Sequence, residues 1–252
     1  MTRFRAFVIC TSPRSGSTML CKLLQETGVA GCPGSHFHRT SLQAWLDSYN
    51  LHASSYGSEK QALTAIFAAA IAKGSGNTGT FGLRLQQHSL SFFLQKLAVL
   101  YPEPSGDQAR LNAAFGPSLF IHLTRENKLE QAISRLKAEQ TGLWHRNADG
   151  SELERLSAPR QPIYDAAAIT AHVKDLTEAD LNWNIWFTKQ GIQPLRITYD
   201  ELSDAPTRVL AGVLKALGQD PAIAQNITPP TAKLSDEVSR EWAHRFRAEN
   251  NE

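Results

Sequence analysis

The chain has 252 residues, enough for one α/β domain, and 42% of them are hydrophobic, which allows a sizeable core. The formal net charge is only +2, so charge alone does not point to a nucleic-acid partner, and any anion binding would be local. Three cysteines without zinc-type spacing, and an N-terminus without a signal-peptide core, favour a reducing cytoplasm. No apolar run reaches the roughly 18 residues of a spanning helix, so we expect no integral membrane span.

Strand-like and helix-like segments alternate along the chain. The sequence predicts strands over 4–11, 79–85, 118–124 and 194–199. It predicts helices over 17–27, 59–73, 89–100, 127–140, 165–189, 204–217 and 235–248. This alternation favours a three-layer α/β/α fold with a central parallel sheet, whose ligand sites lie at the carboxyl ends of the strands. We find no internal repeat and expect residues 1–252 to form a single domain.

Two segments rich in turn residues, 74–79 and 147–162, are predicted to be loops. The second is long enough to be a mobile lid, which we expect over residues 145–162. Trp144 and His145, near its start, could stack on a planar ligand or close over it.

The first predicted strand leads into a loop suited to an anion. Pro13 and Gly16 allow a tight turn, and a helical pattern follows directly. A helix N-terminus presents unpaired N–H groups and the positive end of the helix dipole, so it favours phosphate or sulfate. Arg14 adds a permanent, fork-shaped charge. The predicted anion ligands are therefore Arg14, Ser15, Gly16, Ser17 and Thr18.

Two better-known anion loops do not fit this segment. The Walker A pattern Gly-x4-Gly-Lys-Ser/Thr is absent, which weakens an ATPase or GTPase interpretation. A Cys-x5-Arg phosphatase loop fails because Cys10 lies only four residues before Arg14, while Cys21 lies after it. We therefore predict neither a nucleophilic thiol at the anion nor a metal site.

A second candidate for anion binding follows the strand at 118–124. Arg125 ends this strand, and Ser134 falls nine residues later on the next predicted helix. Taken from the residues alone, Arg125 could equally pair with Glu126 or Glu130 and leave Ser134 solvated. The sequence leaves both interpretations open.

Several motifs together resemble a known family. They are Thr11-Ser-Pro-Arg-Ser-Gly-Ser-Thr-Met-Leu20, Gly28-Val-Ala-Gly-Cys-Pro33, Phe81-Gly-Leu-Arg-Leu85, Phe120-Ile-His-Leu-Thr-Arg125, Gln131-Ala-Ile-Ser134, Ile197-Thr-Tyr-Asp-Glu-Leu202, Ser235-Asp-Glu237 and Glu241-Trp242. Their content and order resemble bacterial sulfotransferases of the trehalose 2-sulfotransferase type over nearly the whole chain. The first motif is the most specific.

The resemblance implies a P-loop-like sulfotransferase fold and a reaction. The donor would be 3′-phosphoadenosine 5′-phosphosulfate (PAPS), and the sulfuryl group would pass to a hydroxyl of a carbohydrate or glycolipid. Arg125 and Ser134 match the arginine and serine that bind the donor's 3′-phosphate in sulfotransferases. Relatives form homodimers, so the resemblance also implies a homodimer. No metal would be needed, because the donor can be held by the loop and arginines.

The chain departs from this family at the expected general base. Relatives carry a glutamate shortly after Gly-Glu-Pro, and an ungapped match puts Ser35 at that position. Ser35 is a poor base, so we predict His36 first and His88 second. Ser35 and Arg84 match positions where the resemblance implies acceptor contact.

Two other functions remain open from the sequence. A nucleotide or small-molecule kinase would share the fold but should show a Walker lysine and metal-binding carboxylates. A catalytically silent nucleotide-binding protein would keep the donor site without a base. The sequence favours a PAPS-dependent sulfotransferase over both.

Overall fold

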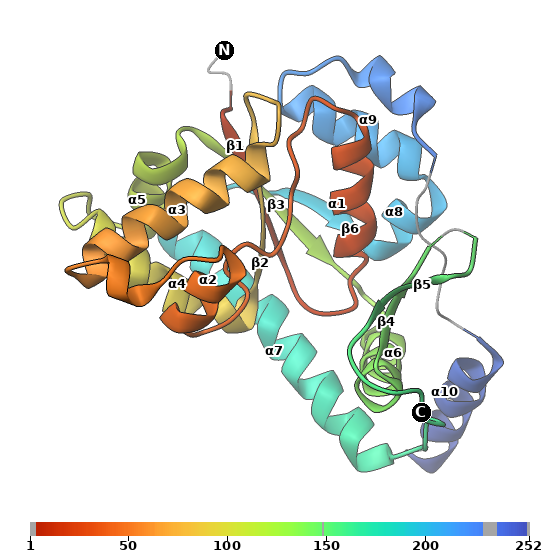
Figure 1. Ribbon diagram of the computed structural model, residues 1–252. Helices are drawn as coiled ribbons and strands as arrows, with labels where there is room; N and C mark the ends of the chain where they lie inside the picture. Colours follow the sequence, from red (N-terminus) through yellow and green to blue (C-terminus); the bar gives the residue numbers. More distant parts are fainter. Residues whose placement is uncertain (1–3, 148, 229–235, 251–252) are drawn as a thin grey trace.

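The computed structural model of the protein describes residues 4–147, 149–228 and 236–250 (Figure 1). Residue 148 of the predicted lid and residue 235 at the start of the predicted C-terminal helix lie outside these ranges. The same holds for both ends of the predicted domain 1–252.

The central sheet has four parallel strands in the order β2-β1-β3-β6. Their bounds are β1 (Ala6–Thr11), β2 (Phe81–Gln86), β3 (Ser118–Thr124) and β6 (Leu195–Thr198). All four predicted strands are confirmed. Strand β1 pairs on both edges and is buried along its whole length, which explains its unbroken apolar sequence.

Helices cover both faces of the sheet, so the predicted three-layer arrangement is confirmed (Figure 1). Alternate residues of β1 divide between two cores: Val8 belongs to one, and Phe7 and Ile9 to the other. The first core includes residues of α2 (Leu42–Ser48), α3 (Glu59–Ser75), α4 (Gln87–Leu100), α5 (Asp107–Phe115) and α7 (Ala166–Gln190). The second includes residues of α1 (Ser17–Glu26), α8 (Tyr199–Asp204) and α9 (Pro206–Ala216).

A third apolar cluster lies beyond the sheet and joins three helices. It contains Ile133 of α6 (Lys128–Thr141), Ile169 of α7, and Trp242 of α10 (Glu237–Glu249). A two-stranded hairpin, β4 (Leu143–Arg146) and β5 (Glu152–Arg155), follows α6 directly. Figure 1 shows this hairpin and α10 at the same end of the molecule as α6.

Four features differ from the sequence predictions. Strand β5 lies inside the segment 147–162 that was predicted to be a loop, and α2 and α5 were not predicted. The predicted helix 204–217 is confirmed as α9, which begins at Pro206, but a short helix that was not predicted, α8, precedes it and begins at the capping box of Thr198 and Glu201. Short 3-10 turns lie at Ala53–Ser55 and Pro221–Asn226.

None of the helices in the described ranges is both long enough and apolar enough to cross a membrane.

Helix α7 is tied to the last residue of β1 by a buried hydrogen bond. Trp183 is fully buried, and its indole N–H donates to the Thr11 carbonyl at 2.9 Å. The substitution Trp183→Phe leaves that carbonyl unpaired, so we expect unfolding free energy to fall by about 1–3 kcal/mol in urea titrations. The control Leu181→Ala, on the same helix at an exposed position, should change stability by less than about 0.5 kcal/mol. Equal stability of Trp183→Phe and the wild type would contradict this role.

Candidate active site

The loop between β1 and α1 is fixed by hydrogen bonds from neighbouring elements. The Thr11 hydroxyl donates to the Leu123 carbonyl of β3 at 2.8 Å. Gln131 of α6 is completely buried, and its side-chain amide donates to the Pro13 carbonyl at 2.7 Å. Its amide also donates to the Ser12 hydroxyl at 3.0 Å. The loop is therefore rigidly preorganised.

The loop backbone makes a sharp left-handed turn before α1. Arg14 has φ 64° and Gly16 has φ 85°, and a positive φ is unusual for arginine. Within the described residues, no side chain caps α1, and its first turn contains no acidic residue. The N–H groups of this first turn therefore have no side-chain acceptor and are free to bind an anion.

This loop forms part of a cavity of about 1020 Å³. Of the predicted site residues, Arg14, Gly16, Ser17, Thr18, Ser35, Arg84, Arg125 and Ser134 line it. Ser15 does not: it is buried, and its hydroxyl lies 2.5 Å from the Thr11 hydroxyl, so only its backbone can reach an anion. Nine arginines and lysines line the cavity against three carboxylates, in a chain whose net charge is only +2. Such a concentration of positive charge suits a multiply charged anion.

Arg14 and Arg125 place two cations in the same part of the cavity. Arg14 donates from Nε to the Ser134 hydroxyl at 3.0 Å and from Nη1 to the Trp144 carbonyl. Burial, followed by the charge of Arg125, lowers the pKa of Arg14 to about 10. Two cations that disfavour each other's charge are stabilised when an anion binds between them.

Arg125 is buried and makes two other contacts. Its Nη2 donates to Glu130 at 2.8 Å, and its guanidinium lies over the Tyr199 ring at 4.3 Å. Its Nε has no hydrogen-bond partner among the described residues. The pairing with Glu130 that the sequence left open is thus present, and Arg125 lines the cavity as well.

A chain of hydrogen bonds crosses the opposite wall of the cavity. Arg84 of β2 donates from Nε to the Ser35 hydroxyl at 2.8 Å and from Nη1 to the Thr18 hydroxyl at 2.7 Å. Thr18 in turn lies 2.9 Å from Nε2 of His145. The segment carrying Ser35 is held to the sheet because the Arg84 amide donates to the Gly34 carbonyl at 2.9 Å. Ser35, Arg84 and Thr18, predicted separately, thus lie together.

His36 lies away from this cavity. It is only 9% exposed, its ring stacks on Phe81 at 5.9 Å, and its Nε2 has no partner among the described residues. Burial lowers the pKa of His36 to about 4. Ser35 contacts Arg84 at the cavity, whereas His36 lies in the turn that follows and packs its ring on Phe81. This geometry does not support the prediction that His36 is the base.

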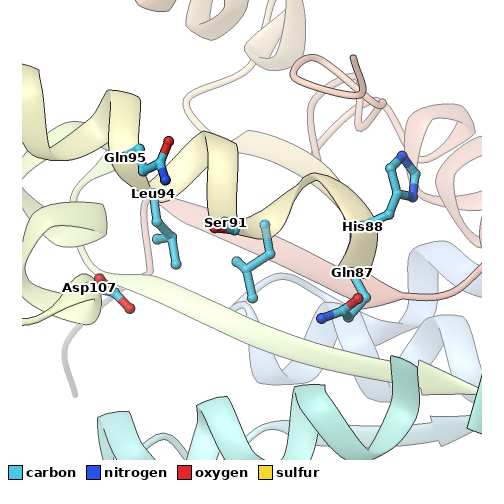
Figure 2. Close-up of a pocket in the computed structure, with 7 residues that line it drawn as sticks. Gln87, His88, Ser91, Leu94, Gln95 and Asp107 are labelled. Carbon is cyan, nitrogen blue, oxygen red and sulfur yellow. The ribbon is translucent and has the colours of Figure 1, made fainter. Parts of the chain in front are cut away.

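His88 is also separated from the anion loop. It lies in the first turn of α4 and lines a different cavity, of about 600 Å³, with Gln87, Ser91, Gln95 and Asp107 (Figure 2). In Figure 2 its side chain stands apart from Leu94 and Asp107. The His88 ring contacts His38 edge-on at 4.9 Å. Of these two histidines, His38 lines the cavity of Arg14 and His88 does not. His88 therefore has no direct access to the loop.

The hairpin β4–β5 supplies six residues of the cavity lining. Trp144 and His145 were predicted to lie against a ligand, whereas Leu143, Arg146, Glu154 and Arg155 were not singled out. Burial is the main reason why the pKa of His145 falls to about 3, and the charges of Arg14, Arg84 and Lys22 lower it further. Each strand has only four residues, and the register between them shifts, so no alternating pattern was long enough to reveal the hairpin.

The two glycines Gly16 and Gly28 provide a matched test of the loop. Both have positive φ, but a Cβ at Gly16 would lie 2.9 Å from Cδ2 of Tyr199, whereas a Cβ at Gly28 would meet nothing within 4 Å. Gly28→Ala should cost about 1–2 kcal/mol of unfolding free energy through its backbone alone. Gly16→Ala should cost more, because Tyr199 must also move. Equal costs in urea titrations would show that Tyr199 does not support the loop.

His36 should make the protein sensitive to acid. The folded pKa of about 4 lies below the ordinary value of 6.5, so the unfolded chain gains a proton first, and stability falls as the pH drops from about 6.5 towards 4. His36→Asn removes this contribution. We expect the variant to lose about 1–2 kcal/mol less unfolding free energy than the wild type between pH 7 and pH 5. Parallel pH curves in urea titrations would contradict the buried, neutral state of His36.

Two solved structures resemble this chain. One is a sulfotransferase from Alicyclobacillus acidocaldarius, with a TM-score of 0.46 and 13% identity, covering 99% of this chain and 93% of that chain. The other is the sulfotransferase domain of the Synechococcus PCC 7002 olefin synthase, with a TM-score of 0.39 and 14% identity, covering 98% of this chain and 96% of that chain. Both TM-scores are below 0.5, so the fold described above rests on the sheet and helices of this chain.

Two relatives found by sequence are more similar to this chain than these solved structures are. A trehalose 2-sulfotransferase of Mycobacterium tuberculosis is 30% identical over 264 residues, covering 97% of this chain and 95% of the relative. A trehalose 2-sulfotransferase of Mycolicibacterium smegmatis is 29% identical over 260 residues, covering 96% of this chain and 94% of the relative. The family model described as Stf0 sulphotransferase matches residues 6–249, from β1 to the end of α10. The resemblance inferred from the motifs is thus confirmed, and the chain belongs to the Stf0 sulphotransferase family of enzymes.

Proposed function

We propose that this sulfotransferase moves a sulfuryl group from PAPS to a hydroxyl of a carbohydrate or glycolipid acceptor. One observation carries the proposal: Arg14 and Arg125, at the ends of two neighbouring strands, line a single cavity at the N-terminus of α1. PAPS carries a phosphosulfate and a separate phosphate, and the cavity offers one cationic group for each. The bond from Arg14 to Ser134 joins the two positions.

In this proposal the donor's phosphosulfate binds the loop and its 3′-phosphate binds beyond it. The backbone N–H groups of residues 15–18, with the Ser17 and Thr18 hydroxyls and Arg14, surround the first position. Arg125 and Ser134 hold the second, where the Arg125 guanidinium supplies a charge-assisted hydrogen bond.

The reaction requires mainly electrostatic stabilisation. Transfer is an in-line displacement in which negative charge grows on the bridging oxygen and on the departing 5′-phosphate. Arg14 and the first-turn N–H groups of α1 stabilise this charge without reorganising, because Gln131 already fixes the loop. Arginines thereby take the role that a metal has in many nucleotide enzymes, and we propose transfer that needs no metal. Among the described residues, no three histidine, cysteine or acidic side chains group as metal ligands.

The acceptor is proposed to bind beside Arg84. Both relatives are named trehalose 2-sulfotransferases, which supports a carbohydrate hydroxyl as acceptor. Ser35 and Arg84 line the wall across from Arg125, and the hairpin β4–β5 covers the same space. We further propose that residues 145–162 act as a lid on a single domain, and that the enzyme works as a homodimer in the cytoplasm.

Calorimetric titration with the desulfonated nucleotide, 3′-phosphoadenosine 5′-phosphate (PAP), tests the donor site. We expect wild-type binding in the micromolar range, unaffected by EDTA, and at least about tenfold weaker binding for Arg14→Ala and for Arg125→Ala. The matched control is Arg135→Ala on α6, which removes an arginine that pairs with Glu139 at 2.8 Å outside the cavity. Its affinity should match that of the wild type.

Three results would count against the proposal. Preference for ATP with magnesium over PAP would indicate a kinase, and equal weakening by Arg135→Ala would show that the arginines act through general charge. Binding of PAP without consumption of PAPS, in a panel of sugars that begins with trehalose, would indicate a catalytically silent protein.

A further inference from the structure

The cavity contains few groups that can take a proton from a hydroxyl near neutral pH. Among the described lining residues they are His38, His145, Glu130, Glu154 and Asp236. Two of these are already engaged: Glu130 pairs with Arg125 at 2.8 Å, and Asp236 pairs with Lys137 at 2.5 Å. The remaining candidates for the general base are therefore His38, His145 and Glu154.

Of these three groups, His145 is the one in direct contact with the helix that receives the anion. Its Nε2 lies 2.9 Å from the hydroxyl of Thr18, in the first turn of α1. His38 is exposed and packs edge-on against His88, and no hydrogen bond joins it to the loop within the described residues. Glu154 contacts His145 rather than α1: its Oε2 lies 3.5 Å from Nε2 of His145.

The hydrogen bonds around Thr18 are compatible with the ring state that a base requires. Arg84 can only donate, and it donates to the Thr18 hydroxyl oxygen at 2.7 Å. The hydroxyl's own proton can then go to Nε2 of His145, 2.9 Å away, when Nε2 carries no proton. A general base at His145 requires this tautomer.

The charges facing His145 come from four elements. Arg14 on the loop, Lys22 on α1 and Arg84 on β2 oppose a positive imidazole, whereas Glu154 on β5 favours it. Burial is the largest cause of the low pKa of His145, and a bound polyanionic donor offsets only the part that comes from Arg14, Arg84 and Lys22. Glu154 then stabilises the imidazolium that forms.

We propose that His145 is the general base of the transfer, an inference that rests on the proposed function. Its Nε2 takes the acceptor's hydroxyl proton while the acceptor oxygen forms its bond to sulfur. The bond between sulfur and the bridging oxygen breaks, and its electron pair leaves with the 5′-phosphate of PAP. The imidazolium afterwards releases its proton to water. Glu154 is a positioning residue in this scheme.

The test compares His145→Gln with the wild type by PAP calorimetry and by PAPS consumption, with trehalose and with water alone as acceptor. Loss of a general base should lower turnover at least about 100-fold, and PAP affinity should stay within about threefold. The rise of wild-type turnover with pH should vanish in His145→Gln and shift to lower pH in Glu154→Gln. His172→Gln is the matched control, since His172 pairs with Glu139 at 3.1 Å outside the cavity.

Several outcomes would overturn the inference. His145→Gln could retain turnover, or its PAP affinity could fall in step with turnover while the pH dependence persisted, which would mean that His145 only supports Thr18. Loss of the pH dependence in His36→Gln instead would return the role to His36. A wild type that binds PAP but never consumes PAPS has no base to assign, whereas one that does not bind PAP refutes the proposed function itself.

Discussion

The active end of this protein depends on holding two arginine side chains close together in a partly buried cavity. Arg14 and Arg125 repel each other, and the pKa of Arg14 is lowered to about 10 by burial and by that repulsion. Burial and this repulsion disfavour the charge of Arg14 in the unliganded protein, and a bound anion would offset both effects. The stability of the surrounding fold offsets this cost.

The sheet makes that arrangement rigid by bringing groups from three adjacent strands to one place. Strand β1 delivers the loop, β3 delivers Arg125, and Arg84 reaches in from within β2. Helices α6 and α7 hold the loop from behind through Gln131 and Trp183. Because hydrogen bonds from β3, α6 and α7 hold the loop and its flanks, the loop can keep Arg14 at positive φ, which is unusual for this residue.

Local sequence patterns predicted much of this architecture. The apolar run of β1 and the turn residues after it were enough to predict strand, anion loop and helix, whereas the role of Arg125 and Ser134 as a second ligand pair came from the resemblance to sulfotransferases and stays a prediction. What failed was orientation that depends on distant contacts. Whether Ser35 or His36 faces the cavity is decided by the contact between Gly34 and β2, which no local pattern encodes. The sequence analysis singled out His145 beside the predicted lid, but it did not single out Glu154, its partner across the hairpin.

A crystal structure of the protein with PAP tests the central claim most directly. The account predicts the 5′-phosphate on the N–H groups at the start of α1 beside Arg14, and the 3′-phosphate between Arg125 and Ser134. Trp144 should then no longer be the main partner of Arg14. A nucleotide bound elsewhere, or a 3′-phosphate with no contact to Arg125, would contradict the assignment of two anion positions to one donor.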